Sequence, residues 1–273
     1  DEIEDLKCAD IKEKHLIVCE YLNNIPYKEG YIYNNYSFVG TKNKEYQRIY
    51  FSDENALKCD AIRMKIEEWF QNNKINENEY YFLLTSLLEN IDKCANTASV
   101  YGAFLKKIKN TASKTFNYYP ANFFINDIEH KVYNKDANEL IETIDTDILY
   151  IDPPYNRRQY SDNYHMLETI AKYDNPEIKG KTGLRNDRIK SLYCSKNDVY
   201  NIFEDLINKA KSKYIFVSYN NEGLLSLEDI KTIMSNKGEY GVFVKEYNRF
   251  KADSKRNNSA SSTFEYLHYC IVK

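Results

Sequence analysis

The stretch Asp147-Ile148-Leu149-Tyr150-Ile151-Asp152-Pro153-Pro154-Tyr155-Asn156 decides the fold and the chemistry of this 273-residue chain. Its first half, residues 147–151, predicts a buried strand. Its second half, residues 152–156, places a carboxylate, two prolines and an aromatic ring directly after that strand. Open α/β sheets bind ligands at the carboxyl ends of their strands, so we expect this sequence to line a ligand site.

The segments that follow predict an α/β sheet around this strand. Residues 139–144 and 199–211 have helical spacing, and residues 213–219 predict a second buried strand. The order strand, helix, strand favours parallel pairing. Two further strand candidates, 241–248 and 264–272, are separated by a polar, basic loop, which predicts an antiparallel hairpin at the end of the sheet.

The N-terminal part of the chain has a different pattern. Residues 60–72 carry apolar side chains on one helical face, and residues 78–110 predict one or two further helices. Residues 131–133 predict a short strand where the pattern changes. We therefore expect a mostly helical region over residues 1–120 and a region containing the sheet over residues 121–273.

Composition and charge exclude several classes of protein. Hydrophobic residues make up 42% and charged residues 29%, which argues against wholesale disorder. No apolar run approaches the roughly 18 residues of a membrane span. The acidic N-terminus is unlike a signal or transit peptide, so we expect a cytoplasmic protein with no membrane partner. The six cysteines form no C-x-x-C pair and no His stands at zinc spacing, so we expect reduced thiols and no metal.

The residue types after the strand suit methyl transfer to an amine of a nucleobase. Such an amine is a poor nucleophile because its lone pair is delocalised into the ring. The carboxylate of Asp152 and the carbonyl of Pro153 can accept both N–H bonds and thereby localise that pair. The two prolines, Pro153 and Pro154, fix φ and hold the backbone in place. Tyr155 can stack on a base turned out of the duplex, and positioning would supply most of the rate.

The same residues resemble a known family. Asp152-Pro153-Pro154-Tyr155 is similar to the catalytic motif of the Dam-like, α-group DNA adenine-N6 methyltransferases of restriction–modification systems. Residues 132–138 resemble the segment before that motif, and residues 216–224 resemble the next strand and turn. The resemblance extends over residues 125–273 and is looser over residues 20–120.

The resemblance implies a Rossmann-like sheet that uses S-adenosyl-L-methionine (SAM) as methyl donor. The catalytic core would be residues 121–273, with Asp152, Pro153, Pro154 and Tyr155 as catalytic residues, and residues 1–120 would contribute to target recognition as a largely helical insertion. Asp136 and Asp152 would contact SAM, since an acidic residue before the family motif holds the adenine of the donor. Contacts with double-stranded DNA are implied for Arg157, Arg158, Gln159, Tyr160, Arg249, Lys251, Lys255 and Arg256.

Three basic stretches are candidates for contacts with the phosphate backbone. For residues 106–114, a solvated helix face is the simpler interpretation. For residues 179–190, which lie in a polar loop, a solvated surface and a DNA contact both stay open. For residues 249–256, the family resemblance favours DNA. His165, close to the catalytic motif, is interpreted as a residue that orders its loop rather than as a general base.

One motif of the family is missing from this sequence. A Gly-rich turn of the F-x-G-x-G kind cradles the methionine part of SAM in the family, and the eight glycines here supply no such turn after a strand. The first two strands of the family's sheet belong to that portion. Without them, the strand over residues 147–151 would have unpaired backbone groups and an exposed apolar edge. We therefore expect a complementing N-terminal chain or segment.

The sequence predicts a site-specific adenine-N6 DNA methyltransferase and leaves alternatives open. Cytosine-N4 methylation and methylation of an RNA base use related motifs. A catalytically incomplete fragment or subunit that binds DNA would also carry these motifs, and the missing Gly-rich turn supports that alternative. A methyltransferase for protein amines or small molecules fits the basic terminal loop less well.

Overall fold

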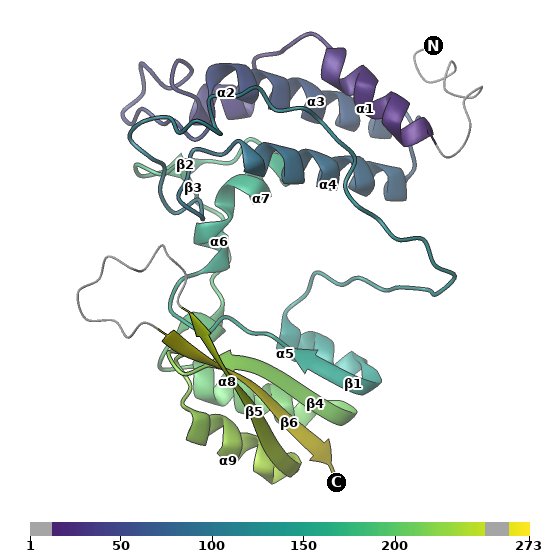
Figure 1. The fold of residues 1–273 in the computed structure, drawn as a ribbon, viewed down its shortest axis with the longest axis vertical. Helices are drawn as coiled ribbons and strands as arrows, with labels where there is room; N and C mark the ends of the chain where they lie inside the picture. The colour runs from purple at the N-terminus through teal and green to yellow at the C-terminus, as the bar shows by residue number, and fades with distance from the viewer. Residues whose placement is uncertain (1–12, 249–261) are drawn as a thin grey trace. The chain divides into compact units, whose positions relative to one another are not determined.

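The computed structural model describes residues 13–248 and 262–273 of the chain (Figure 1). The chain divides into two compact units: unit 1 comprises Asp1–Asn126 and Ser161–Arg188, and unit 2 comprises Asp127–Tyr160 and Ile189–Lys273. The sequence predicts a single division at residue 120, whereas unit 1 runs to Asn126 and also contains Ser161–Arg188. The chain therefore leaves unit 2 shortly after the Asp-Pro-Pro-Tyr motif and returns to it at residue 189.

Unit 1 is mainly helical. Two of its helices begin with side-chain caps: Ser52 accepts a hydrogen bond from the backbone of Asn55, and Asn76 and Glu79 form a reciprocal capping box. Each such cap stabilises a helix by about 1 kcal/mol. The elements are α1 (Lys14–Asn24), α2 (Tyr31–Tyr36), α3 (Asp53–Gln71), α4 (Glu77–Lys93), α7 (His165–Lys172), β2 (Ile178–Lys179) and β3 (Leu184–Arg185), with α6 (Tyr160–Asn163) at the junction of the units.

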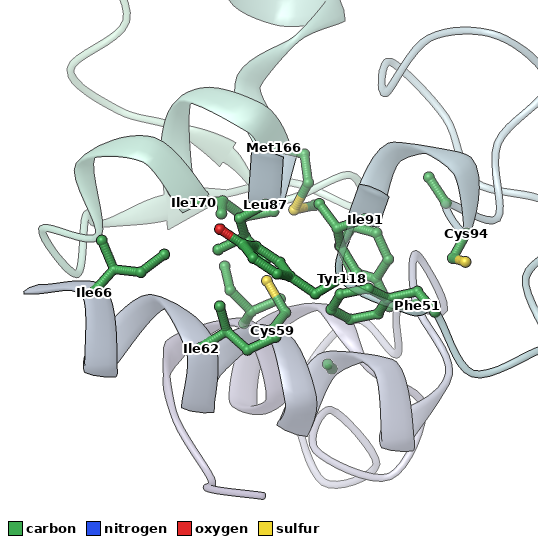
Figure 2. Close-up of a cluster of buried hydrophobic side chains, with 14 of the residues drawn as sticks. Phe51, Cys59, Ile62, Ile66, Leu87, Ile91, Cys94, Tyr118, Met166 and Ile170 are labelled. Carbon is green, nitrogen blue, oxygen red and sulfur yellow. The ribbon is translucent and has the colours of Figure 1, made fainter. Parts of the chain in front are cut away.

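The core of unit 1 lies between α3, α4 and α7 (Figure 2). Apolar side chains recur at helical spacing along each helix and meet in the middle. The predicted helix over residues 60–72 is confirmed as part of α3. The core side chains labelled in Figure 2 include Cys59, Ile62 and Ile66 from α3, Leu87 and Ile91 from α4, Met166 and Ile170 from α7, and Tyr118 from an irregular segment.

The helices predicted over residues 78–110 are confirmed only in part. Helix α4 ends at Lys93, and residues 94–121 form an irregular segment that contains no helix. Side-chain amides take the place of helical or strand partners for its backbone, which is why it does not need regular structure. Asn96 binds Leu105 O and Lys109 N, Asn55 binds Lys114 O and Phe116 N, and Asn23 binds both N and O of Tyr118, all at 2.8–3.0 Å.

Unit 2 is a mixed α/β structure. Within the described residues its sheet is four-stranded, in the order β1-β4-β6-β5. β1 and β4 are parallel, and β6 is antiparallel to both β4 and β5. The elements are α5 (Ala137–Leu140), the 3-10 helix η2 (Ile141–Thr143), β1 (Asp145–Ile151), the 3-10 helix η3 (Leu192–Cys194), α8 (Val199–Lys209), β4 (Lys211–Asn220), α9 (Leu227–Lys237), β5 (Gly238–Asn248) and β6 (Ser262–Val272).

Most of the predicted elements of unit 2 are confirmed. The strands predicted over residues 147–151 and 213–219 pair in parallel, and the last two strands pair as an antiparallel hairpin, as the patterns predict. The prediction that the first of these strands is buried is wrong for the described chain, because Ile151 is the only buried residue of β1. The strand predicted over residues 131–133 is wrong: these residues form no strand, and the side chain of Val132 is 94% exposed. Three residues with one alternation are too few to specify a strand that has no neighbour to pair with.

The two faces of this sheet differ. One face packs against α8 and α9 (Figure 1), where Phe203 of α8 and Met234 of α9 are fully buried with Ile215 of β4. On the other face, Ile148 and Tyr150 of β1 are 61% and 60% exposed. Among the described strands, β1 has β4 as its only neighbour. Its second edge and one apolar face are therefore uncovered in the described part of the chain.

None of the described helices is both long and apolar enough to cross a membrane. No disulfide joins the described cysteines, which are all buried. Within the same residues, no group of three or more His, Cys, Asp or Glu side chains is arranged to hold a metal ion.

Arg63 of α3 joins this helix to the end of α7. Its guanidinium donates to the carbonyls of Ile170 and Ala171, both at 3.0 Å, and its side chain is only 2% exposed. We expect Arg63→Leu to lower the free energy of unfolding of unit 1 by about 2–4 kcal/mol, because it leaves buried carbonyls without donors. Backbone hydrogen exchange over residues 165–173 should accelerate. The control is Lys65→Leu on the same helix, and equal exchange in both variants would contradict the prediction.

His268 of β6 gives a second prediction. Its ring is buried and shares a hydrogen bond of 2.9 Å with the hydroxyl of Tyr240. Burial lowers the pKa of His268 from 6.5 to about 4. Between about pH 6.5 and pH 4, His268 is protonated in the unfolded chain but stays neutral in the folded chain. Its contribution to the free energy of unfolding is therefore lost as the pH falls from about 6.5 toward 4. We expect the NMR signal of the His268 imidazole to keep its neutral position down to about pH 5, and titration near pH 6.5 would contradict this.

Candidate active site

The parallel pairing of β1 with β4 brings the predicted motif beside the end of a second strand. Ile151, the last residue of β1, is in register with Val217 of β4. The next residues, Asp152 and Ser218, therefore lie side by side at the carboxyl end of the sheet. The side chain of Asp152 is exposed, whereas Pro153 is buried and fixes the backbone that follows the strand.

The hydroxyl of Tyr155 bridges these two neighbours. It lies 2.7 Å from Oδ1 of Asp152 and 2.7 Å from Oγ of Ser218. Burial raises the pKa of Tyr155 well above its usual value, so the phenol keeps its proton and donates it to the Asp152 carboxylate while Ser218 donates to the phenol oxygen. The Tyr155 ring packs against Tyr219 with centroids 4.8 Å apart, and its carbonyl accepts from the backbone of Leu224 at 2.8 Å.

The turn after β4 is shaped to hold the Tyr155 backbone. Gly223 lies against the Tyr219 ring, and a Cβ atom on Gly223 would come within 2.1 Å of that ring. Only a glycine therefore allows the turn to close so tightly over Tyr219. The hydroxyl of Tyr219 in turn donates to the carbonyl of Tyr155 at 3.3 Å and accepts from the backbone of Leu225.

Two residues of this site were not singled out from the sequence. Ser218 lies within the stretch 216–224 that carries the family resemblance, so its position was visible but its contact with Tyr155 was not. Glu265 of β6 pairs with Asn220 of β4. Burial, followed by the charge of Asp152, raises the pKa of Glu265. Nothing in the sequence pointed to Glu265, because the pairing of β6 with β4 brings it in from a distant part of the chain.

The loop after the motif presents its predicted DNA-contacting residues in different ways. Arg157, Arg158 and Tyr160 have exposed side chains. The side-chain amide of Gln159 binds the backbone of Ser191 through both ends, donating to its carbonyl at 3.1 Å and accepting from its N–H at 2.7 Å. Gln159 therefore anchors the loop to the segment that precedes η3. The charged side chains of Arg157 and Arg158 face solvent.

Asp136, the predicted contact for the adenine of SAM, begins α5. Its Oδ1 accepts from the backbone of Asn138 at 2.9 Å and of Glu139 at 3.3 Å, so one carboxylate oxygen caps the helix. The side chain is exposed. The following residue of the motif region, Asn138, is buried and binds Asp205 of α8 at 2.8 Å, which fixes the position of α5 on α8.

The remaining candidates lie elsewhere. Arg249, Lys251, Lys255 and Arg256 are outside the described residues. His165 lies in unit 1, fully buried, with Nδ1 3.0 Å from Asp162 O and Nε2 3.1 Å from Thr182 O. Burial lowers the pKa of His165. Both ring nitrogens lie within hydrogen-bond distance of backbone carbonyls, and a neutral imidazole, which has one N–H, donates to one of them. This contact agrees with a residue that orders its loop.

The carboxyl end of β1 thus combines an exposed carboxylate, a fixed proline backbone and a half-buried phenol ring. Hydrogen-bond acceptors beside an aromatic face suit a flat ring that carries an amine. Such a constellation suits the transfer of a group to the amine of a nucleobase.

Comparison with known proteins identifies the family. The D12 class N6 adenine-specific DNA methyltransferase family matches residues 3–233, and the chain belongs to this family. Its family makes it an adenine-specific DNA methyltransferase, and SAM is the methyl donor that the family implies.

Curated relatives are Type II methyltransferases. The chain is 53% identical to the Type II methyltransferase M.NlaIII of Neisseria lactamica, over 90% of this chain and 73% of that protein. It is 42% identical to the Type II methyltransferase M.FokI of Planomicrobium okeanokoites, over 97% of this chain and 40% of that protein. It is 37% identical to the Type II methyltransferase M.CviAII of Paramecium bursaria Chlorella virus 1, over 98% of this chain and 79% of that protein. No solved structure was found to match.

Substitutions at Tyr155 separate its ring from its hydroxyl. Tyr155→Phe keeps the ring available for stacking, so we expect methylation of DNA to stay within about tenfold of the wild type. Tyr155→Ala removes the ring. Stacking on an aromatic ring is worth about 1–3 kcal/mol per base, so from the expected stacking of Tyr155 on the target base we expect a loss of about 10–100-fold. The measurement is kcat and KM for DNA at saturating SAM. If both variants lose the same activity, the hydroxyl rather than the ring carries the role.

Proposed function

We propose that Asp152 and the backbone carbonyl of Pro153 accept the two N–H bonds of the target adenine amine in DNA, and that the Tyr155 ring stacks on the flipped base. The observation that supports these roles best is the position of the three groups at the carboxyl end of β1, with the Asp152 carboxylate exposed and already acting as an acceptor for Tyr155. When the amine binds, it replaces the Tyr155 hydroxyl at Asp152, and Ser218 keeps a hydrogen bond to that hydroxyl.

The chemistry follows from these contacts. SAM, when bound, would supply a methyl group on a positively charged sulfur, and the carbon–sulfur bond would break to leave a neutral thioether. Asp152 and Pro153 hold the amine with its lone pair localised and directed at that methyl group, and the extra proton of the methylated amine then leaves to water. Positioning by fixed groups accounts for most of the acceleration, and no covalent enzyme intermediate is needed.

The residues around Asp152 fit a cationic donor. Burial raises the pKa of Glu265, and the nearby charge of Asp152 raises it further. A positively charged ligand would relieve this repulsion. We assign Asp152 and Asp136 to SAM, with Asp136 using the carboxylate oxygen that does not cap α5. The exposed Arg157, Arg158 and Tyr160 are assigned to DNA, and Gln159 to anchoring their loop.

A complementing segment is part of this proposal. β1 has a free second edge among the described strands, and its exposed Ile148 is in register with Tyr214 of β4, itself 43% exposed. An unpaired edge beside an apolar face favours the addition of a further strand. We propose that a further chain or segment, equivalent to the N-terminal portion of the family's sheet, pairs with β1 and supplies the Gly-rich turn for SAM. A monomer of this chain that methylates DNA by itself would contradict this requirement.

The first experiment measures transfer of labelled methyl groups from SAM to unmethylated DNA of mixed sequence. Because every short site is present in such DNA, an unknown specificity does not hide activity. With the complementing segment present, we expect the label in N6-methyladenine and a loss of about 100–1000-fold for Asp152→Ala, since this variant removes the acceptor that orients the amine.

The matched control is Asp147→Ala on the same strand. Asp147 is exposed and ion-paired with Lys213 at 2.7 Å, away from the carboxyl end of β1. The Asp147→Ala variant should keep the methylation activity of the wild type. Label in N4-methylcytosine, or equal losses in both variants, would contradict the assigned chemistry. If the wild-type chain alone gives no label and becomes active after a complementing segment is added, the chain alone is inactive because it lacks that segment. The role assigned to Asp152 would then stand.

A further inference from the structure

The hairpin formed by β2 and β3 in unit 1 has an unusual turn. Gly180 and Gly183 both have positive φ, at 68° and 69°, so the four residues from Gly180 to Gly183 form a tight turn that needs glycine at both ends. The amide of Gly183 also donates to the carbonyl of Gly180 at 3.2 Å. A Cβ atom on Gly183 would come within 2.8 Å of the Tyr36 ring, so the turn is pressed against the body of the unit.

Buried side chains hold all four carbonyl oxygens of this turn. Arg48 donates to Gly180 O at 2.9 Å and to Lys181 O at 3.1 Å, His165 contacts Thr182 O at 3.1 Å, and the Tyr36 hydroxyl donates to Gly183 O at 2.8 Å. Arg48 is 5% exposed, and Tyr36 and His165 are fully buried. The negative ends of the peptide groups are therefore turned inward, and the outer surface of the turn carries side chains.

The basic residues of this region divide into two groups. Arg185 is buried and binds Asp174 and Asp187 at 2.6–3.0 Å, and Arg188 binds Asp162. These arginines are neutralised by carboxylates and build the base of the hairpin. Lys179 and Lys181, on the hairpin itself, are exposed. The stretch over residues 179–190, for which the sequence left two interpretations open, thus contains structural arginines and outward-facing lysines.

The surroundings of the turn add positive charge. Lys44 donates to the side chain of Asn35 at 2.7 Å, and the backbone carbonyl of Asn35 accepts from Arg48. Partial burial, and then the charge of Arg48, lower the pKa of Lys44. The guanidinium of Arg48 therefore repels the ammonium group of Lys44, and an anion bound at the surface would relieve this repulsion.

We propose that the β2–β3 hairpin of unit 1 contacts the phosphate backbone of the DNA substrate through Lys179 and Lys181. This rests on the proposed function, because it takes double-stranded DNA as the substrate. The contact positions the duplex and carries no sequence information, since a lysine ammonium reads phosphate as a point charge. A turn whose backbone is already fixed loses little conformational entropy when DNA binds.

The test compares the charge-matched double variants Lys179→Ala/Lys181→Ala and Lys213→Ala/Lys231→Ala. The control lysines are exposed surface residues of unit 2, paired with Asp147 and Glu228. Binding of a DNA duplex is measured at a series of salt concentrations between about 0.05 and 0.3 M, which gives the slope of log K against log salt. Each phosphate contact adds about 0.9 to the magnitude of that slope. We expect the hairpin variant to lose about 1.8 from that slope and to bind about 10–100-fold more weakly at about 0.1 M salt.

The weakening should be equal for duplexes of different sequence, with KM for DNA raised and kcat at saturating DNA unchanged. An unchanged slope in the hairpin variant, or the same change in the control variant, would overturn the proposal while wild-type binding and methylation remain. Failure of the proposed function has another signature: even with the complementing segment present, the wild-type chain would then neither bind nor methylate the duplex. Equal thermal unfolding of both variants establishes that the hairpin variant is folded.

Discussion

The parallel pairing between β1 and β4 is the constraint on which the site depends. Because Ile151 and Val217 are in register, Asp152 and Ser218 must emerge side by side, and both are within 2.7 Å of the Tyr155 hydroxyl. A shift of one residue in this register would turn Asp152 toward the opposite face of the sheet. The buried side chains on the α8 and α9 face hold the register, so the chemistry is positioned by packing on the far side of the strands.

Unit 1 uses a different principle. Much of its chain is irregular, and buried or half-buried polar side chains satisfy its backbone in place of regular hydrogen-bond ladders. Asn23, Asn55 and Asn96 hold the segment over residues 94–121, and Arg63 holds the end of α7. A buried side chain that binds backbone groups costs little because each polar atom finds a partner. This arrangement allows long loops to be fixed in defined positions without strands.

The excursion of the chain into unit 1 immediately after the motif is central to the proposed DNA contacts. Ser161–Arg188 leaves unit 2 next to the Asp-Pro-Pro-Tyr motif and packs into the helical unit through Met166 and Ile170. The same segment carries the β2–β3 hairpin, with its lysines outward and its arginines neutralised. One continuous stretch of chain, from Asp152 to Lys181, therefore contains the residues proposed to hold the target base. It also contains Lys179 and Lys181, which are proposed to contact the DNA phosphate backbone.

The sequence by itself determined the alternation of strands and helices in unit 2, the motif at the end of β1, and the family through the residues around Asp152. These features are local, because side-chain periodicity and proline stereochemistry act within a few residues. It could not determine that residues 94–121 avoid a helix, that residues 131–133 form no strand, or that Arg185 is neutralised while Lys181 is exposed. Only the tertiary structure decided these, since they depend on partners such as Asn23, Asn55 and Asp174 that packing brings within hydrogen-bond distance.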